Sequence, residues 1–214
     1  MDDYNKFLTM LEKEDKDSAV LFILNLLDSK KYDLYTIYKD FLERSLIDFG
    51  CGLNDKDICI WKEHTRSSII RTIIESTYSY IIKIKNNTKQ LNKKVVVFCP
   101  QGEFHEIGAI IVSNYFTLAG FDSIYIGANT PNEQVISAIK GLKPDYLAIS
   151  VTNYYNLVVT QKLTDDIKNI YPKIKIIVGG QAFTYKGALD YIKYDYHIDS
   201  MKEILEIAGD LKWN

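Results

Sequence analysis

The spacing of apolar positions changes from helical to strand-like partway along the chain. Within residues 1–85, apolar side chains recur three and four positions apart, which predicts amphipathic helices. Two shorter stretches of this kind cover residues 4–13 and 18–28, and two longer ones follow. Asp33 can cap the third helix and Gly50 can end it, while Asp55 and Asp57 open the fourth. The stripes of the two longer helices are Leu34, Ile37, Tyr38, Phe41, Leu42 and Leu46, then Ile69, Ile70, Ile73, Ile74, Tyr78, Ile81 and Ile82. Four helices with short connections predict a small four-helix bundle over residues 1–85.

Residues 94–214 instead contain short, continuous apolar runs separated by helix-length stretches. The runs cover residues 94–99, 122–127, 145–150 and 175–180, with a weaker one at 194–198. Such runs are typical of parallel strands that are covered on both faces. They predict an α/β domain with a flavodoxin-like, doubly wound sheet of five parallel strands, and a final helix near 200–211. The polar, lysine-rich segment 86–93 is predicted to link the two domains.

Composition narrows the class of protein. Hydrophobic residues make up 47% of the 214 positions and charged residues 25%, as in ordinary globular proteins. The formal net charge is −2 with basic residues dispersed, so we expect no direct nucleic-acid binding. There is no signal-peptide pattern and no run of about 18 apolar residues, so we expect no membrane association. Cys51, Cys59 and Cys99 lack metal-ligand spacing and are predicted to be free thiols, which favours a cytoplasmic location.

Polar and small residues gather where the predicted strands end. These residues are Glu103, His105 and Gly108 after the first strand, Ser150 and Thr152 after the third, and Gly179 and Gly180 after the fourth. In a doubly wound sheet, ligands bind beyond the carboxyl ends of the strands. A neutral imidazole can bind a transition metal, and a carboxylate two residues away can accept its other ring N–H. The hydroxyls could face a polar heterocycle, and the glycines leave room where a bulky ligand approaches the backbone. Each of these residues, taken alone, could also be an ordinary loop residue.

His105 has no companion that would complete a metal site made of protein alone. No second His, Cys or carboxylate cluster lies at a suitable spacing. A lone histidine therefore predicts a metal that another molecule already holds, as a tetrapyrrole-like cofactor does.

The spacing of these motifs resembles that of the cobalamin-binding domain family, in which acid-x-His-x-x-Gly, Ser-x-Leu and Gly-Gly follow one another at similar intervals. Here 41 residues separate Gly108 from Ser150, and 26 separate Thr152 from Gly179. Thr152 stands where the family usually has Leu. The resemblance covers residues 93–210, and residues 1–85 resemble the four-helix cap that precedes this domain in the same proteins.

The resemblance implies a cobalamin bound base-off and His-on. His105 would replace the cofactor's own benzimidazole on the lower face of cobalt, and the upper face would meet the helical cap. The displaced nucleotide tail would enter the crevice. The cofactor-binding residues implied in this domain are Glu103, Ile107, Gly108, Ser150, Thr152, Gly179 and Gly180.

The chain looks more like the cobalamin sensor domains of light-responsive MerR-type regulators than like corrinoid carrier proteins. The carriers usually read Asp-x-His-x-x-Gly-Lys-Asn, whereas this chain has Glu103 and continues differently after Gly108. The sensors carry a Glu-His pair in the bundle with a branched aliphatic residue four positions before the His, and Ile60, Glu63 and His64 match this pattern. The resemblance implies that Glu63 binds the ribose of an adenosyl group. The alternative is that Glu63 and His64 are a solvated helix pair, part of a charged face with Lys62 and Arg66.

The chain departs from the sensors at one point. They place a Trp, followed by a second cobalt-binding His, where this chain has Leu53 and Asn54. Whether light is the signal therefore stays open.

Together these features predict a cobalamin sensor module that is not an enzyme. We expect adenosylcobalamin as its cofactor, with methylcobalamin as the other candidate, and an output through a protein partner or self-association. The alternative is a corrinoid methyl carrier that serves a methyltransferase system. A mutase would need a barrel domain, and a response regulator would need a phosphoacceptor Asp where this chain has Cys99 or Ser150.

Overall fold

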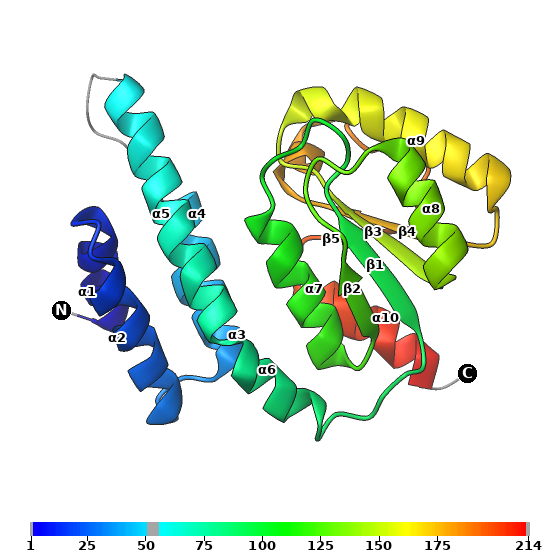
Figure 1. The fold of residues 1–214 in the computed structure, drawn as a ribbon. Helices are drawn as coiled ribbons and strands as arrows, with labels where there is room; N and C mark the ends of the chain where they lie inside the picture. Colours follow the sequence, from blue (N-terminus) through cyan, green and yellow to red (C-terminus); the bar gives the residue numbers. More distant parts are fainter. Residues whose placement is uncertain (1, 51–55, 213–214) are drawn as a thin grey trace. The chain divides into compact units, whose positions relative to one another are not determined.

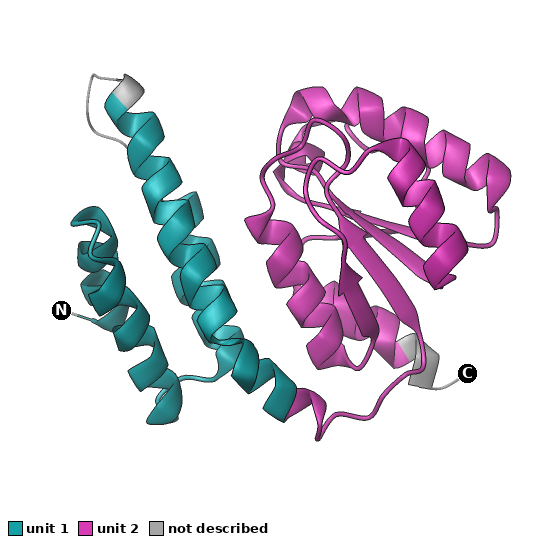
Figure 2. Cartoon of the chain, viewed as in Figure 1, with its two compact units in different colours: residues 1–83 teal, residues 84–214 magenta. Residues whose placement is uncertain are grey.

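The computed structural model describes residues 2–50 and 56–212, which form two compact units, residues 1–83 and 84–214 (Figure 2). The first unit is helical, and the second holds a parallel sheet with helices on both faces (Figure 1).

The first unit consists of helices whose apolar faces form a buried core. Its elements are α1 (Asp3–Glu12), α2 (Lys16–Asp28), α3 (Leu34–Thr36), the π-helical η1 (Ile37–Glu43), α4 (Arg44–Ile47), α5 (Lys56–Ser76) and most of α6 (Tyr78–Lys85). Because α3, η1 and α4 follow one another without a break, the described residues form the four predicted helices, with α6 as a continuation of α5. Asp33 caps the third helix as predicted, and its Oδ1 accepts a hydrogen bond from Thr36 N at 2.7 Å. Phe7, Ile23 and Ile70 are fully buried in the core.

The third helix ends at Ile47 and not at Gly50. The Asp48 side chain, just past the end, accepts hydrogen bonds from Tyr4 Oη at 3.0 Å and Arg44 Nε at 3.1 Å. Side-chain contacts within the unit therefore fix the end of this helix earlier than the glycine predicts.

The fourth helix is interrupted at Thr77, although the sequence predicts one continuous stripe. The buried Thr77 hydroxyl donates to the Ile74 carbonyl at 2.8 Å and lies 2.9 Å from Tyr38 Oη. A hydroxyl that binds a preceding carbonyl competes with the helical ladder and bends helices.

The cysteine prediction is wrong for one residue. Cys59 is disulfide-bonded, whereas Cys99 is free and buried. Sequence spacing does not reveal which thiols approach in three dimensions, which is why the pairing was missed. The cysteines therefore do not support the expected reducing compartment. The positions of Cys51, Leu53, Asn54 and Asp55 lie outside the described residues.

No helix in the described ranges has both the length and the apolar character needed to cross a membrane.

The second unit contains the predicted five-stranded parallel sheet. Its strands are β1 (Lys94–Phe98), β2 (Asp122–Tyr125), β3 (Tyr146–Ser150), β4 (Lys175–Gly179) and β5 (Tyr196–Ile198). All neighbours are parallel, in the order β2-β1-β3-β4-β5. This is the flavodoxin-like order, so the predicted topology is confirmed.

Helices cover both faces of this sheet. They are α7 (Ile107–Ala119), α8 (Asn132–Leu142), α9 (Leu157–Ile170) and α10 (Met201–Lys212), with the short η2 (Tyr154–Asn156) and η3 (Gln181–Thr184) after β3 and β4. In Figure 1, α7 and α10 lie on one side of the sheet and α8 and α9 on the other. Because side chains alternate along a strand, Val96 and Phe98 point to the α8–α9 face, where they share a core with Leu163 and Ile167.

Two aspartates form hydrogen bonds at the amino ends of β1 and β4. Asp145 accepts hydrogen bonds from Lys94 N at 2.9 Å and Lys93 Nζ at 2.8 Å. Asp195 accepts from Ile176 N at 2.8 Å and from Lys168 Nζ at 2.5 Å. Each aspartate precedes one strand and binds the strand beside it, so it helps to fix their register.

The end of the predicted linker packs against the second unit. Leu91 N donates to the Gly120 carbonyl at 2.8 Å, and Asp122 N donates to the Lys93 carbonyl at 2.9 Å. Gly120 has φ +100°, and a Cβ there would lie 2.4 Å from the Lys89 carbonyl oxygen. The glycine therefore lets this part of the chain pass close to the α7–β2 turn.

Candidate functional site

The loop between β1 and α7 carries the histidine motif at the carboxyl edge of the sheet. Glu103 N donates to the Pro100 carbonyl at 2.9 Å, and Asn129 N donates to the Glu103 carbonyl at 2.8 Å. The neighbouring loop after β2 thus braces the backbone that presents His105.

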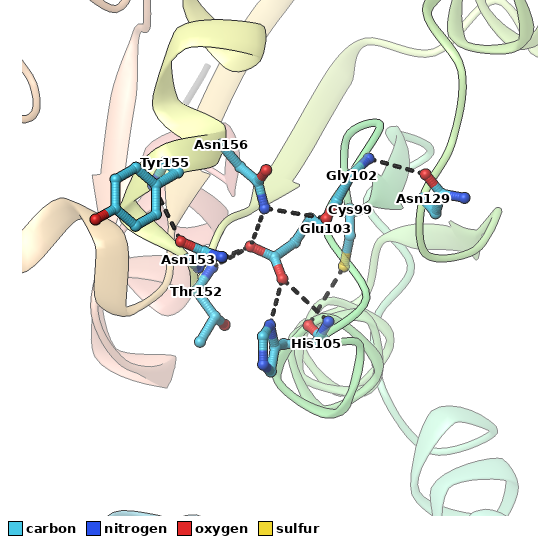
Figure 3. A network of polar contacts seen from close by, with 9 residues as sticks. All are labelled: Cys99, Gly102, Glu103, His105, Asn129, Thr152, Asn153, Tyr155 and Asn156. Atoms are coloured by element: carbon cyan, nitrogen blue, oxygen red, sulfur yellow. Dashed lines mark hydrogen bonds and ion pairs between the residues drawn. The ribbon is translucent and has the colours of Figure 1, made fainter.

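The Glu103 carboxylate is the centre of the hydrogen-bond network in Figure 3. Glu103 has no exposed surface. Its Oε2 accepts from Thr152 N at 3.0 Å, Asn153 N at 2.8 Å and Asn156 Nδ2 at 3.0 Å. Its Oε1 accepts from His105 N at 3.1 Å and His105 Nδ1 at 2.5 Å. One oxygen is therefore tied to the loop after β3, and the other serves His105.

This network keeps the carboxylate ionised. Burial alone would raise the pKa of Glu103, but the hydrogen bonds from Asn153 N, Asn156 Nδ2 and His105 outweigh it and hold the pKa below its usual value. An ionised carboxylate can only accept hydrogen bonds, so the proton between the two side chains resides on His105 Nδ1.

This arrangement leaves the other ring nitrogen of His105 able to bind a metal. With the proton on Nδ1, the ring's Nε2 carries the lone pair, and it has no hydrogen-bond partner within the described part of the chain. The side chain is 57% exposed. No group of three or more His, Cys, Asp or Glu residues that could hold a metal ion occurs in the described ranges. This donor set suits a metal that a macrocycle brings with it.

Ser150 and Gly108 face each other beside this histidine. Ser150 is the last residue of β3, and its hydroxyl makes no hydrogen bond within the described residues. A Cβ on Gly108, the second residue of α7, would lie 3.8 Å from Ser150 Oγ. The absent side chain thus leaves space beside the hydroxyl. Ile107 is half-buried at the start of α7.

Thr152 contributes its backbone to the network. Its N–H binds Glu103, a role that does not depend on the side chain's identity. This explains how Thr can stand where the family usually has Leu.

Gly179 and Gly180 make room for the protein's own backbone. A Cβ on Gly179 would lie 2.6 Å from the Ile198 carbonyl oxygen of β5. Gly180 has φ +102°, and its Cβ would lie 2.5 Å from the Val151 carbonyl oxygen. From the sequence we expect both glycines to make room for a bulky ligand. In the structure, the close approach of backbone carbonyls at the strand ends already requires them.

The predicted residues of the helical cap lie on one stretch of α5. Ile60, Glu63 and His64 are all exposed, and Ile60 is 52% accessible. Lys62, beside them, forms an ion pair with Glu14. Arg66 is buried, and its Nη1 donates a hydrogen bond to the Ser45 carbonyl at 2.9 Å. Arg66 therefore does not belong to a solvated face, and the exposed pair is flanked by residues that hold the bundle together.

Sequence reasoning missed the asparagines of the network. Asn153 and Asn156 supply two of the donors to Glu103, and Asn129 Oδ1 accepts from Gly102 N at 2.8 Å. Their sequence signal was the N-x-x-N segment directly after a buried strand and the asparagine in the loop after β2.

Cys99 lies beneath the histidine loop. Burial, with help from the nearby Glu103 and Glu106 carboxylates, raises the pKa of its thiol to about 12. Its Sγ donates to the His105 carbonyl at 3.6 Å. The thiol is protonated at neutral pH and supports the loop.

Comparison with known proteins places this site in a family. The model of the B12 binding domain matches residues 93–206. Trimethylamine corrinoid protein 1 of Methanosarcina acetivorans is 29% identical over 125 residues, which cover 58% of this chain and 57% of the relative. The HTH-type transcriptional repressor CarA of Myxococcus xanthus is 22% identical over 156 residues, 71% of this chain and 51% of the relative. The chain thus spans little more than half the length of these curated relatives.

A solved structure shows the same fold along nearly the whole chain. The monomethylamine corrinoid protein of Methanosarcina barkeri superposes with a TM-score of 0.80 at 16% identity, and the match covers 96% of both chains. The family match includes the whole sheet and the motif around His105. This chain therefore belongs to the B12-binding domain family, and its cofactor is a cobalamin or a related corrinoid.

Proposed function

We propose that this protein binds its corrinoid through His105 and serves as the methyl-carrying corrinoid protein of a methyltransferase system. The observation that supports His105 as the ligand is its geometry: Nδ1 is held by a buried carboxylate and Nε2 is accessible. The similarity to trimethylamine and dimethylamine corrinoid proteins, at 28–30% and 27–29% identity, supports the carrier over the sensor that the sequence favoured.

In this proposal each residue near the sheet edge has a separate task. His105 Nε2 would bind cobalt, and Glu103 would hold the imidazole in the required orientation and tautomer. Ser150 Oγ would hydrogen-bond the displaced nucleotide tail, and Gly108 would leave the space for it. The bound corrinoid would supply a cobalt that accepts and releases a methyl group.

The sensor remains a second candidate because of one group of residues. The sequence match to CarA covers 71% of this chain, compared with 58% for trimethylamine corrinoid protein 1, and Ile60, Glu63 and His64 are exposed on α5. In the sensor, Glu63 would bind the ribose of adenosylcobalamin. A methyl group offers no hydrogen bond to this carboxylate.

Binding of three cobalamins distinguishes the two candidates. Purified protein is titrated with hydroxo-, methyl- and adenosylcobalamin, and absorption spectra report His-ligated against base-off cofactor. For the carrier, we expect methylcobalamin to bind at least as tightly as adenosylcobalamin, and Glu63→Ala to change neither affinity by more than about twofold, or about 0.4 kcal/mol. The methyl-loaded protein should also lose its methyl group to an acceptor when a methyltransferase encoded beside it is added.

Two results would overturn parts of this proposal. A preference of about tenfold or more for adenosylcobalamin that Glu63→Ala abolishes would establish the sensor instead. A His105→Ala variant with an unchanged His-ligated spectrum would remove His105 as the ligand, and His64→Ala and His197→Ala are its matched controls because these are the other histidines of the chain.

A further inference from the structure

Two adjoining cavities lie at the amino ends of the strands, at the opposite end of the sheet from the loop that carries His105. The larger has a volume of about 490 Å³ and the smaller about 310 Å³, and Lys93 and Asp145 line both. Ligand sites in proteins commonly have volumes of about 300–1,000 Å³. The walls are rich in basic side chains, namely Lys85, Lys93, Lys94, Lys143, Lys173 and Lys175. A lining of this kind favours a negatively charged ligand.

Half of these lysines carry a charge that no acidic side chain balances. The other half have aspartate partners within 2.9 Å, in the pairs Lys93–Asp145, Lys94–Asp122 and Lys175–Asp195. The ammonium groups of Lys85, Lys143 and Lys173 have no partner among the described residues. The whole chain has a formal net charge of −2, so this concentration of unpaired positive charge is local.

The carbonyl ends of three helices reduce this charge but do not cancel it. α6 ends at Lys85, and the C-caps of α7 and α8 are Gly120 and Lys143, all of which line the larger cavity. A helix end is equivalent to about half a negative charge, so the three ends offset about half of the charge of the three unpaired lysines. A net positive charge therefore remains for an anion.

One wall of the larger cavity is the linker between the two units. Gln90 Nε2 donates to the carbonyls of Lys85 at 3.3 Å and Thr88 at 3.0 Å, which holds this segment in a turn. Leu91 N, on the same segment, is bound to the Gly120 carbonyl. The wall is therefore shaped before a ligand arrives, and this lowers the entropic cost of binding.

We propose that these cavities bind an oligophosphate, that is, two or three linked phosphate groups, either free or as part of a nucleotide. A lysine ammonium group binds phosphate oxygens as a point charge. The three unpaired ammonium groups come from three different segments and so match several linked anionic groups, whereas a single phosphate would fill only a small part of the larger cavity. This site goes beyond the proposed function, because it lies at the opposite edge of the sheet from His105.

Calorimetric titration of the full chain measures this binding, at about 50 mM salt to limit screening. The probes are tripolyphosphate and ATP, with orthophosphate and citrate for comparison. We expect one tripolyphosphate to bind per chain, and orthophosphate and citrate to bind at least about tenfold more weakly because each carries fewer negative charges. ATP that binds as tightly as tripolyphosphate would identify a nucleotide as the source of the phosphates, and weaker ATP binding would identify a free oligophosphate.

A pair of double variants locates the site. Lys85→Gln combined with Lys143→Gln should weaken tripolyphosphate binding by about tenfold or more, because two charged contacts are lost. Lys162→Gln combined with Lys186→Gln is the matched control. It changes the net charge by the same amount, and neither residue lines the two cavities.

Limited trypsin digestion gives a second readout, because the linker forms part of the site. Saturating tripolyphosphate should slow cleavage after Lys89 severalfold in the wild type but not in the Lys85→Gln, Lys143→Gln variant. Cleavage after Lys30, in the first unit, should stay constant and so excludes inhibition of the protease.

Four results would overturn the proposal. They are the absence of one-to-one binding by both tripolyphosphate and ATP, equal weakening in the two double variants, citrate binding as tight as that of tripolyphosphate, and unchanged cleavage after Lys89. The first would show that the cavities take no oligophosphate, and the second that binding is a non-specific effect of surface charge. The third would assign the cavities to polycarboxylates, and the fourth would place the ligand away from the linker.

Discussion

Gly108 lies beside Ser150 at the carboxyl edge of the sheet. It is the exposed second residue of α7, and a Cβ there would lie 3.8 Å from Ser150 Oγ, an ordinary contact distance. No contact with the described residues requires a glycine here, in contrast to Gly180.

We therefore expect Gly108→Leu to weaken cobalamin binding without harming the fold. Leucine favours the helix by about 0.5–1 kcal/mol relative to glycine, so the thermal unfolding midpoint should stay constant or rise. The larger side chain would fill the space in front of Ser150, so retention should fall by at least about tenfold. Gly108→Ala is the control and should bind nearly normally. Full retention by the leucine variant would show that the ligand does not use this space.

At this scale the sequence predicted the contact between Glu103 and His105, but not the residues that hold Glu103 in place. The E-x-H spacing was sufficient to predict the contact between Glu103 Oε1 and His105 Nδ1, because the two residues lie only two positions apart in one loop. The donors to Oε2 come from residues about 50 positions away. Their approach depends on how the loop after β3 turns, which no local pattern encodes.

Among the elements, the strand ends of β3, β4 and β5 are packed backbone against backbone. We expect Gly180→Ala to lower the free energy of unfolding by at least about 2 kcal/mol, because a positive φ and a blocked Cβ position both oppose it. Gly209→Ala in α10 is the matched control: its Cβ would meet no atom within 4 Å, and it should stabilise by about 0.5–1 kcal/mol. Urea unfolding of both variants measures the difference. Equal effects would mean that the strand ends tolerate a shift.

Asp195 gives the β4–β5 edge a dependence on pH. Burial would raise the pKa of Asp195, but hydrogen bonds from Lys168, Lys175 and Ile176 N lower it below 3.8. A lowered folded-state pKa means that this stabilisation is complete above the unfolded value and is lost as the pH falls through the folded one. We expect Asp195→Asn to cost about 1–2 kcal/mol at pH 7, with the deficit shrinking below about pH 4.

The control for this prediction is Asp165→Asn, which removes an exposed pair with Lys193. Such pairs contribute about 0–1 kcal/mol, so the change should be small at every pH. A deficit of Asp195→Asn that persists unchanged at low pH would contradict the charge-based account and indicate altered packing.

The strand order was predictable because five continuous apolar runs admit few right-handed parallel arrangements. The breaks and ends of the helices were less predictable from the sequence. The break at Thr77 depends on a hydrogen bond to Tyr38, 39 residues earlier, and the end at Ile47 depends on Tyr4. Helical periodicity shows only which side of a helix is apolar. It therefore cannot predict either the break at Thr77 or the end at Ile47.

For the whole molecule, the second unit is compact and contains its own hydrophobic core, so we expect it to fold alone. A fragment of residues 84–214 should give cooperative thermal unfolding and bind cobalamin in the His-ligated form. A fragment that starts at residue 94 lacks the Leu91 N–Gly120 hydrogen bond and the Lys93 carbonyl that binds Asp122 N, and should be less stable by about 1–3 kcal/mol. Aggregation of the longer fragment would mean that the helical unit is needed for folding.

The two glycines at the end of β4 also bear on how this family would evolve. Because Gly179 and Gly180 accommodate carbonyls of the chain itself, selection for a stable sheet retains them whether or not a cofactor is bound. A descendant that abandoned corrinoids could lose Glu103 and His105 and still keep both glycines. When genomes are surveyed for B12 dependence, the histidine loop should therefore be the diagnostic mark, while the paired glycines trace common ancestry of the scaffold.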